Sequence, residues 1–324
     1  MLGWLLNESD VLRFGEDVLM PLSRSIRIYI EGEIYPPTPY DPYSRWIIPK
    51  PWHLPLEDIL IFTMLTVIIS LIEVIVIRRV IANVAQFFDL HSKDYARFKE
   101  SFWQFCFYTP AWILECFIVY DKPFFYEPCL VWEPPFPRQL MDTSIFWLYA
   151  FQIAWYMHCT IFHVFVDARK SDFWPMLLHH FVTLLLLICA YTSGYYRVGI
   201  LCLFCLDICD IFLHASKTIR LIENVRPLNP VFIVTAYIGM VLSWFFFRLV
   251  LFPVKVIYTS LVQSIDYGGW INADNWFFFN VLLFIIFVLQ VYWFGLILKS
   301  GYKFIRYGEE LDDHRDPSAI KKQQ

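Results

Sequence analysis

Four ionisable side chains capable of acid–base chemistry lie inside apolar segments of this sequence. His179 and His180 are in one segment, and Asp207 and Asp210 are in the next. Ionisable groups are costly within segments long enough to span a membrane, so they indicate functional sites by default. An imidazole held by a carboxylate suits general base catalysis, and an imidazole can also carry an acyl group as a nucleophile. Polar pairing between helices and histidine ligation of haem are the alternative interpretations.

A metal site is the weaker chemical interpretation. The chain has eight His, and three of them (His53, His91 and His314) fall in predicted loops. That leaves too few for the histidine-rich sets of membrane di-iron enzymes. No Cys/His spacing suggests structural zinc, and the eight Cys lie mostly in apolar segments, where Cys acts as a small hydrophobe. We predict no metal site and no disulfide framework between loops.

The composition is that of a multi-pass membrane protein. Of the 324 residues, 58% are hydrophobic and 17% are charged, whereas soluble domains have about 45–50% apolar and about 25% charged residues. The apolar residues come in blocks of about 20, enough to cross a hydrocarbon core about 30 Å thick. The net charge is −4 and no basic face alternates with aromatic residues, so nucleic acid is not an expected partner.

Seven blocks are long enough to span the membrane, which predicts an all-α polytopic fold. They cover residues 56–77, 102–119, 140–166, 173–192, 196–214, 231–252 and 276–298. We predict loops between them, including a basic loop up to residue 101, an extended Pro-rich loop over 121–139 and a loop over 253–275. Residues 1–55 include no cleavable signal peptide but do include an amphipathic stretch suited to the membrane surface. The count of spans stays open, because the third block is long and the amphipathic stretch could insert partly.

The basic residues predict the orientation. With a lumenal N-terminus, the cytosolic segments hold 16 Lys and Arg and the lumenal segments hold 9, which is a positive-inside bias. Asn7 of the Asn7-Glu8-Ser9 sequon is then on the glycosylating side. The terminal sequence KKQQ, residues 321–324, fits the dilysine retrieval pattern read by cytosolic coat proteins. These features predict a multi-pass endoplasmic-reticulum protein with a lumenal N-terminus and a cytosolic C-terminus.

In this orientation the four ionisable groups fall in one layer near the cytosol. His179 lies about six residues into its span, roughly 9 Å deep at about 1.5 Å per residue. Asp210 and Asp207 lie about five and eight residues from the predicted exit of theirs, roughly 8–12 Å deep. The two Asp are at positions i and i+3 and share one helix face, with His214 one turn beyond Asp210.

The segment LLHHFVTLLLLICAYTSGYYRVGILCLFCLDICDIFLHASK, residues 177–217, resembles the Lag1 signature of ceramide synthases within the TLC-domain superfamily. The likeness covers about residues 95–315 and includes KESFWQFCFY at 99–108, DARKSDFWPMLLHH at 167–180 and SWFFFRLVLFP at 243–253. The chain has no homeobox-like insert after its first span and is most similar to the homeobox-lacking, stearoyl-preferring subgroup. The implied organisation is a lumenal segment (1–55), a first transmembrane helix with a cytosolic loop (56–94), a TLC domain (95–300) and a cytosolic tail (301–324).

This resemblance implies N-acylation of a sphingoid base by a fatty acyl-CoA, giving dihydroceramide or ceramide. It implies a ring of transmembrane helices around a lipid tunnel, and no cofactor apart from acyl-CoA as co-substrate. The His pair of the motif corresponds to His179 and His180, and its acidic positions correspond to Asp207 and Asp210. Membrane lipids are further expected partners, as is a second copy or a related chain in a homo- or hetero-dimer.

Five further side chains are candidates for substrate binding. They are His158, Arg169, Lys170, His214 and Lys217. The basic ones are suited to CoA phosphates, although positive-inside charge explains them equally well.

The chain departs from the family signature at Leu206, where a His usually precedes the first Asp, and at His214, where Glu is usual. His158 and His214 are candidate substitutes for the missing imidazole. This departure leaves open an alternative function, a non-catalytic TLC protein that senses, sorts or chaperones lipids or membrane proteins.

Overall fold

The computed structural model describes residues 54–90, 92–133, 136, 141–166, 171–223, 225, 228–266 and 276–307. Within these ranges every regular element is a helix, and seven helices are long and apolar enough to span a membrane. The predicted all-α polytopic fold is therefore confirmed. The predictions for Asn7, Arg169, Lys170 and the KKQQ end fall outside the described residues.

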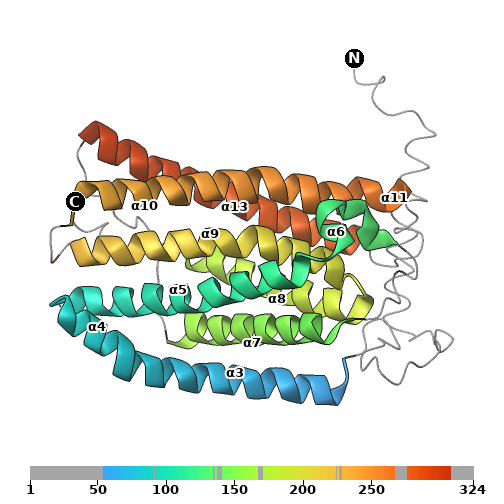
Figure 1. Cartoon of the computed structure of the whole chain (residues 1–324), viewed down its shortest axis with the longest axis horizontal. Helices are drawn as coiled ribbons and strands as arrows, with labels where there is room; N and C mark the ends of the chain where they lie inside the picture. The colour runs from blue at the N-terminus through green and yellow to red at the C-terminus, as the bar shows by residue number, and fades with distance from the viewer. Residues whose placement is uncertain are drawn as a thin grey trace.

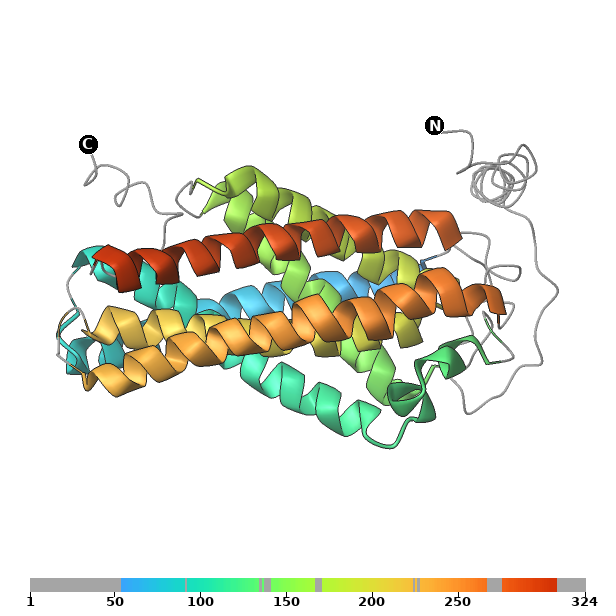
Figure 2. The same cartoon turned by 90° about the horizontal axis from the view of Figure 1, so that it is seen from above.

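The helices run back and forth along one long axis (Figure 1). α3 (Leu56–Val76) continues through η2 (Ile77–Ile81) into α4 (Ala82–Phe87), and α5 (Ser92–Val119) returns to the short elements α6 (Pro123–Tyr126) and η3 (Pro128–Trp132). α7 (Thr143–Phe165), α8 (Phe173–Ser193) and α9 (Tyr196–Glu223) follow. α10 (Pro230–Ser243) continues through η4 (Trp244–Leu251), η5 (Pro253–Ile257), η6 (Thr259–Gln263) and α11 (Ser264–Asp266), and α13 (Trp276–Tyr307) ends the described chain. Figure 2 shows α10 to α11 as one long rod beside α13.

Several segments predicted as loops are partly helical in the structure. The basic segment before residue 101 is mostly helical, α9 runs nine residues beyond His214, and the loop assigned to 253–275 is helical as far as Asp266. The predicted extended loop over 121–139 starts with two short helical elements. In the segments before residue 101 and after His214, hydropathy detects only the apolar part of a helix, whereas the helix itself continues where long charged side chains reach water. Asp210 thus lies about 20 Å from the end of α9 at Glu223, farther than the predicted span implied.

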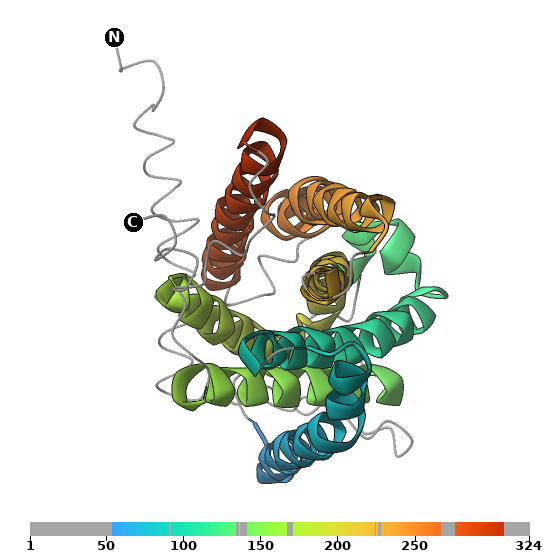
Figure 3. The ribbon, with the colours of Figure 1, turned by 90° about the vertical axis from the view of Figure 1, so that its left-hand side faces the viewer.

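Six helices form a closed ring. Contacts join α5 to α7, α7 to α8, α8 to α13, α13 to η4 and α10, α10 to α9, and α9 back to α5 (Figure 3). α3 is outside this ring and packs on α7. At one end of the ring α8 and α9 meet, because Gly194 ends α8 with a left-handed φ of 81° and the chain turns straight back. The opposite end encloses the site.

Candidate functional site

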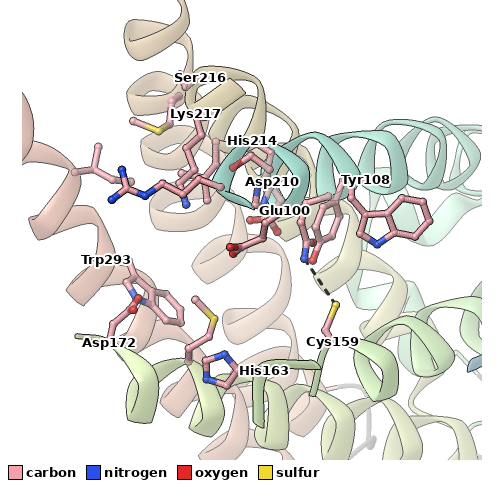
Figure 4. A pocket seen from close by; sticks show the side chains of 18 of the residues that line it. Glu100, Tyr108, Cys159, His163, Asp172, Asp210, His214, Ser216, Lys217 and Trp293 are labelled. Atoms are coloured by element: carbon pink, nitrogen blue, oxygen red, sulfur yellow. Dashed lines mark hydrogen bonds between the residues drawn. The ribbon is translucent and has the colours of Figure 1, made fainter. Parts of the chain in front are cut away.

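A cavity of about 330 Å³ lies inside the ring and gathers ionisable residues from six helices. Figure 4 shows Glu100, Asp210 and His214 on one wall, facing His163 and Asp172 on the other. The cavity is lined by both members of the His pair and by three of the five candidate substrate-binding residues (His179, His180, His158, His214 and Lys217). The sequence predicted His179, His180, Asp207 and Asp210 in one layer. The structure places the two histidines and Asp210 around one space, and Asp207 outside its lining.

The two histidines of the pair face different neighbours. The His179 ring lies 5.3 Å from the Trp293 ring, edge to face, and its Nδ1 is 3.5 Å from Thr183 Oγ1. The His180 ring lies 5.5 Å from the ring of His163 on α7. Successive helical residues point about 100° apart, which accounts for this divergence. The Nδ1 side of the His179 ring therefore faces Thr183.

Asp210 lines the cavity and is fixed by a buried arginine. Arg248 Nη2 donates to Asp210 Oδ2 at 2.7 Å and to the Leu206 carbonyl oxygen at 2.7 Å. Nη1 donates to Gln290 Oε1 at 2.8 Å, and the guanidinium carbon lies 4.0 Å from the centroid of the Trp244 ring. Charge-assisted bonds of this length are among the stronger hydrogen bonds in proteins. The wide turns of η4, followed by Pro253, carry Arg248 into this position.

Asp207 is not part of the cavity wall, although it is only one turn from Asp210. Its side chain is fully buried and accepts a 2.6 Å hydrogen bond from Gln152 Nε2, which also donates to Glu115 Oε1 at 2.9 Å. Positions i and i+3 differ by about 60° around a helix. That rotation suffices to turn Asp207 toward α5 and α7 while Asp210 faces the cavity.

A second, smaller pocket of about 40 Å³ lies deeper in the ring and is almost wholly apolar. Leu206 lines this pocket together with Tyr156, Leu186 and Phe279. The Tyr156 ring is 6.2 Å from the His179 ring and 6.1 Å from the His180 ring. Tyr156 therefore stands between the His pair and the apolar pocket, and the side chain at position 206 faces the apolar side.

His158 and His214 both border the same cavity as His179. The His214 ring lies parallel to the Tyr108 ring at 6.1 Å. His158 Nδ1 is 2.9 Å from Ser70 Oγ, and its Nε2 is 3.1 Å from Glu73 Oε2. Among the residues described here, no group of three or more His, Cys, Asp and Glu is placed to hold a metal ion.

Sequence reasoning missed several residues of the site. Glu73, Glu115 and Arg248 are ionisable groups in apolar spans, so the rule that selected His179 would have found them. Arg97 and Lys99 also line the cavity, beside Lys217 and Arg220. They had been assigned to a loop, and only the early start of α5 at Ser92 brings them to the cavity.

Comparisons with known proteins agree with this architecture. A family model described as TLC domain matches residues 97–299. Ceramide synthase 4 of Mus musculus is 32% identical over 219 residues, which is 68% of this chain and 53% of that protein. Ceramide synthase 1 of Homo sapiens is 30% identical over 247 residues, 72% of this chain and 68% of that protein. Ceramide synthase hyl-1 of Caenorhabditis elegans is 28% identical over 227 residues, 67% of this chain and 60% of that protein. The chain thus spans about half the length of Ceramide synthase 4, and α3 precedes the matched region.

Proposed function

Because the chain belongs to the ceramide synthase family of TLC-domain proteins, we propose that it transfers a fatty acyl group from acyl-CoA to the amine of a sphingoid base. The product is dihydroceramide or ceramide. One observation carries this proposal: a single cavity holds the adjacent imidazoles of His179 and His180 and an arginine-fixed carboxylate, with basic residues on its wall and an apolar pocket beside it. The relatives are named as synthases, so a non-catalytic TLC protein is not favoured.

In this proposal His179 is the reacting imidazole. It either accepts the acyl group or takes a proton from the amine. Asp210 is held by Arg248 and presents a carboxylate of fixed position, paired with that guanidinium, to the cavity. Asp207 acts indirectly, because it is buried against Gln152 and Glu115 and holds α9 to α5 and α7.

The two ends of the acyl-CoA have different binding surfaces. The CoA phosphates match the basic side chains of Arg97, Lys99, Lys217 and Arg220, which line the cavity. The apolar pocket beyond Tyr156, of about 40 Å³, matches part of the acyl chain. Acyl-CoA is cytosolic, so we propose that the basic end of the ring faces the cytosol in the endoplasmic-reticulum membrane, with the N-terminus lumenal. Stearoyl preference stays a prediction.

The test is N-acyltransferase activity in cells that lack endogenous ceramide synthase. Labelled sphinganine is supplied with acyl-CoAs of several chain lengths, and the N-acyl product is measured with His179→Ala, expressed to the same level, as the control. We expect product for the unmodified chain, most with stearoyl-CoA, and at least a hundredfold less for the variant, about the lower limit for loss of a positioned acid–base group. A folded, correctly inserted chain that makes no N-acyl product at any length would overturn the proposal.

A further inference from the structure

The first membrane helix, which lies before the matched TLC region, contributes a carboxylate to the cavity. Glu73 of α3 and His158 of α7 both line the cavity, with only 6% and 3% of their surfaces exposed. His158 Nε2 lies 3.1 Å from Glu73 Oε2, and Phe162 covers the imidazole at 4.2 Å between ring centroids. Glu73 is therefore buried from water but borders the space where substrates would bind.

His158 is held from both sides of its ring. Its Nδ1 lies 2.9 Å from Ser70 Oγ, which also lies 2.8 Å from the Thr66 carbonyl oxygen. Its Nε2 faces the Glu73 carboxylate at 3.1 Å. The imidazole is therefore fixed against the carboxylate, at the edge of the cavity.

Two groups that can each accept a proton, an imidazole and a carboxylate, therefore face each other. Nε2 of His158 and Oε2 of Glu73 are in contact, and Oε2 has no hydrogen-bond partner among the described residues. Buried acceptors without donors are costly, so such a pair favours either a shared proton or a ligand rich in donors. A protonated primary amine supplies three N–H donors and a positive charge.

We propose that Glu73 and His158 form the binding site for the ammonium group of the sphingoid base and accept its first proton. This inference rests on the proposed function. The location fits a lipid substrate, because the rest of α3 exposes large apolar side chains such as Met64, Val67 and Leu71 on the outside of the ring. The amine of a membrane lipid would meet this carboxylate where α3 packs on α7.

The proton transfer completes the reaction without a further reactant. The ammonium gives one proton to the Glu73–His158 pair and becomes a neutral amine, which can attack the acyl carbonyl. The C–N bond then forms as the C–S bond of the thioester breaks, and the second amine proton goes to the CoA thiolate, by way of His179. The pair finally releases its proton to water, so the products are the amide, free CoA and one proton.

The experiment compares Glu73→Gln with Glu57→Gln in the purified full chain. Glu57 is on the same helix but exposed, far from the cavity, so its variant should behave like the unmodified chain. Glu73→Gln replaces an acceptor by an amide that brings its own donors. We expect it to raise KM for sphinganine by about tenfold or more while KM for acyl-CoA is unchanged, as for the loss of one charged contact. Unchanged KM for sphinganine would overturn the inference.

A binding measurement separates this inference from the proposed reaction. Octadecylamine and octadecanol differ only in the head group, and their binding can be followed by quenching of tryptophan fluorescence. We expect the unmodified chain to bind the amine about tenfold more tightly than the alcohol, and Glu73→Gln to lose that preference.

If the unmodified chain makes no N-acyl product but shows this selectivity, the proposed reaction is wrong and the amine site is supported. If it acylates sphinganine but Glu73→Gln keeps both KM and the amine preference, the site is wrong. Should Glu73→Gln not fold, Glu73→Asp, which shortens the carboxylate's reach, is judged by the same two measurements.

Discussion

The cavity and the apolar pocket are neighbours built by the same helices, yet they differ in nearly every property. The cavity takes charged or titratable side chains from α3, α5, α7, α8, α9 and η4, whereas the polar groups of the pocket are hydroxyls and a thiol. α9 changes from one environment to the other within a single turn, with Asp210 in the cavity and Leu206 in the pocket. If the cavity performs the proposed reaction and the pocket holds the acyl chain, substitutions should affect the two functions separately.

The largest expected effect is the loss of activity in His179→Ala. If the cavity alone performs the chemistry, removing this imidazole should lower the rate of N-acylation about 10²–10⁴-fold, the range for a positioned acid–base group. His163→Ala is the matched control, because His163 is a histidine of the same cavity that bonds the Phe173 carbonyl oxygen instead. Product formation is measured with sphinganine and stearoyl-CoA. Equal losses in both variants would argue against a special role for His179.

Arg248→Leu should have the next largest effect, on folding as well as activity. It leaves Asp210 without its arginine and the Leu206 carbonyl without two hydrogen bonds. Removing one partner of a buried ion pair typically costs about 3–5 kcal/mol. We expect a clear fall in the midpoint of thermal unfolding in detergent, and a smaller fall for Arg248→Lys, which keeps the charge. Equal stability of all three proteins would contradict the role of Arg248 in fixing the cavity wall.

Filling the apolar pocket should change the preference for acyl-chain length and leave the reaction itself unchanged. Leu186→Trp places a larger side chain in the lining of the pocket. We expect the preference between long and short acyl-CoAs to shift toward short chains by roughly tenfold or more, since one methylene in a hydrophobic pocket is worth about 1–3 kcal/mol. Competition between acyl-CoAs of two lengths measures this ratio, with the exposed Phe181→Trp on the same helix as control. An unchanged ratio would mean that the pocket does not hold the chain.

Leu206→His tests whether the missing motif histidine limits the rate. Position 206 faces the apolar pocket, so the new imidazole should not reach the space beside His179. We expect no gain in activity and a loss of stability of about 1–3 kcal/mol from burying a polar group with few partners. Activity and thermal unfolding are measured on the same preparation. A rise in activity would show that the cavity and pocket are not separate as described.

Much of the fold follows from the sequence because the membrane imposes it. A bilayer requires about 20 apolar residues per helix, and the seven predicted blocks each correspond to a span in the structure. The ends of α4, α5 and α9 were not predictable in this way. Their charged turns lie outside the apolar blocks, and the helix continues there through packing and side chains that hydropathy does not record.

The site was predicted in part, and the limit is the rotation of helices against one another. His179, Asp210 and His158 were found because a lone ionisable group in an apolar run is visible in sequence. Their partners were not assigned, because Arg248 is 38 residues from Asp210 and Glu73 is in a helix far from His158. Only tertiary packing decides which of several ionisable groups meet, and which carboxylate of α9 faces the cavity.

The smallest expected effect lies beyond the pocket, at the opposite end of the ring from the basic residues. Lys122 Nζ lies 3.0 Å from Asp142 Oδ2, between the start of α6 and the start of α7. Hydrogen bonding and charge from Asp142 raise the pKa of Lys122 above its usual value of 10.5. The stabilisation by this ion pair is therefore fully present at neutral pH and is lost as the pH rises through the raised pKa.

Lys122→Met should lower the free energy of unfolding by at most about 1 kcal/mol, because the pair is partly exposed to water. Thermal unfolding at neutral pH should show a small decrease, while KM for sphinganine and the chain-length ratio stay unchanged. A change in either constant would mean that this end of the ring is coupled to the cavity, against the separation inferred from the lining residues.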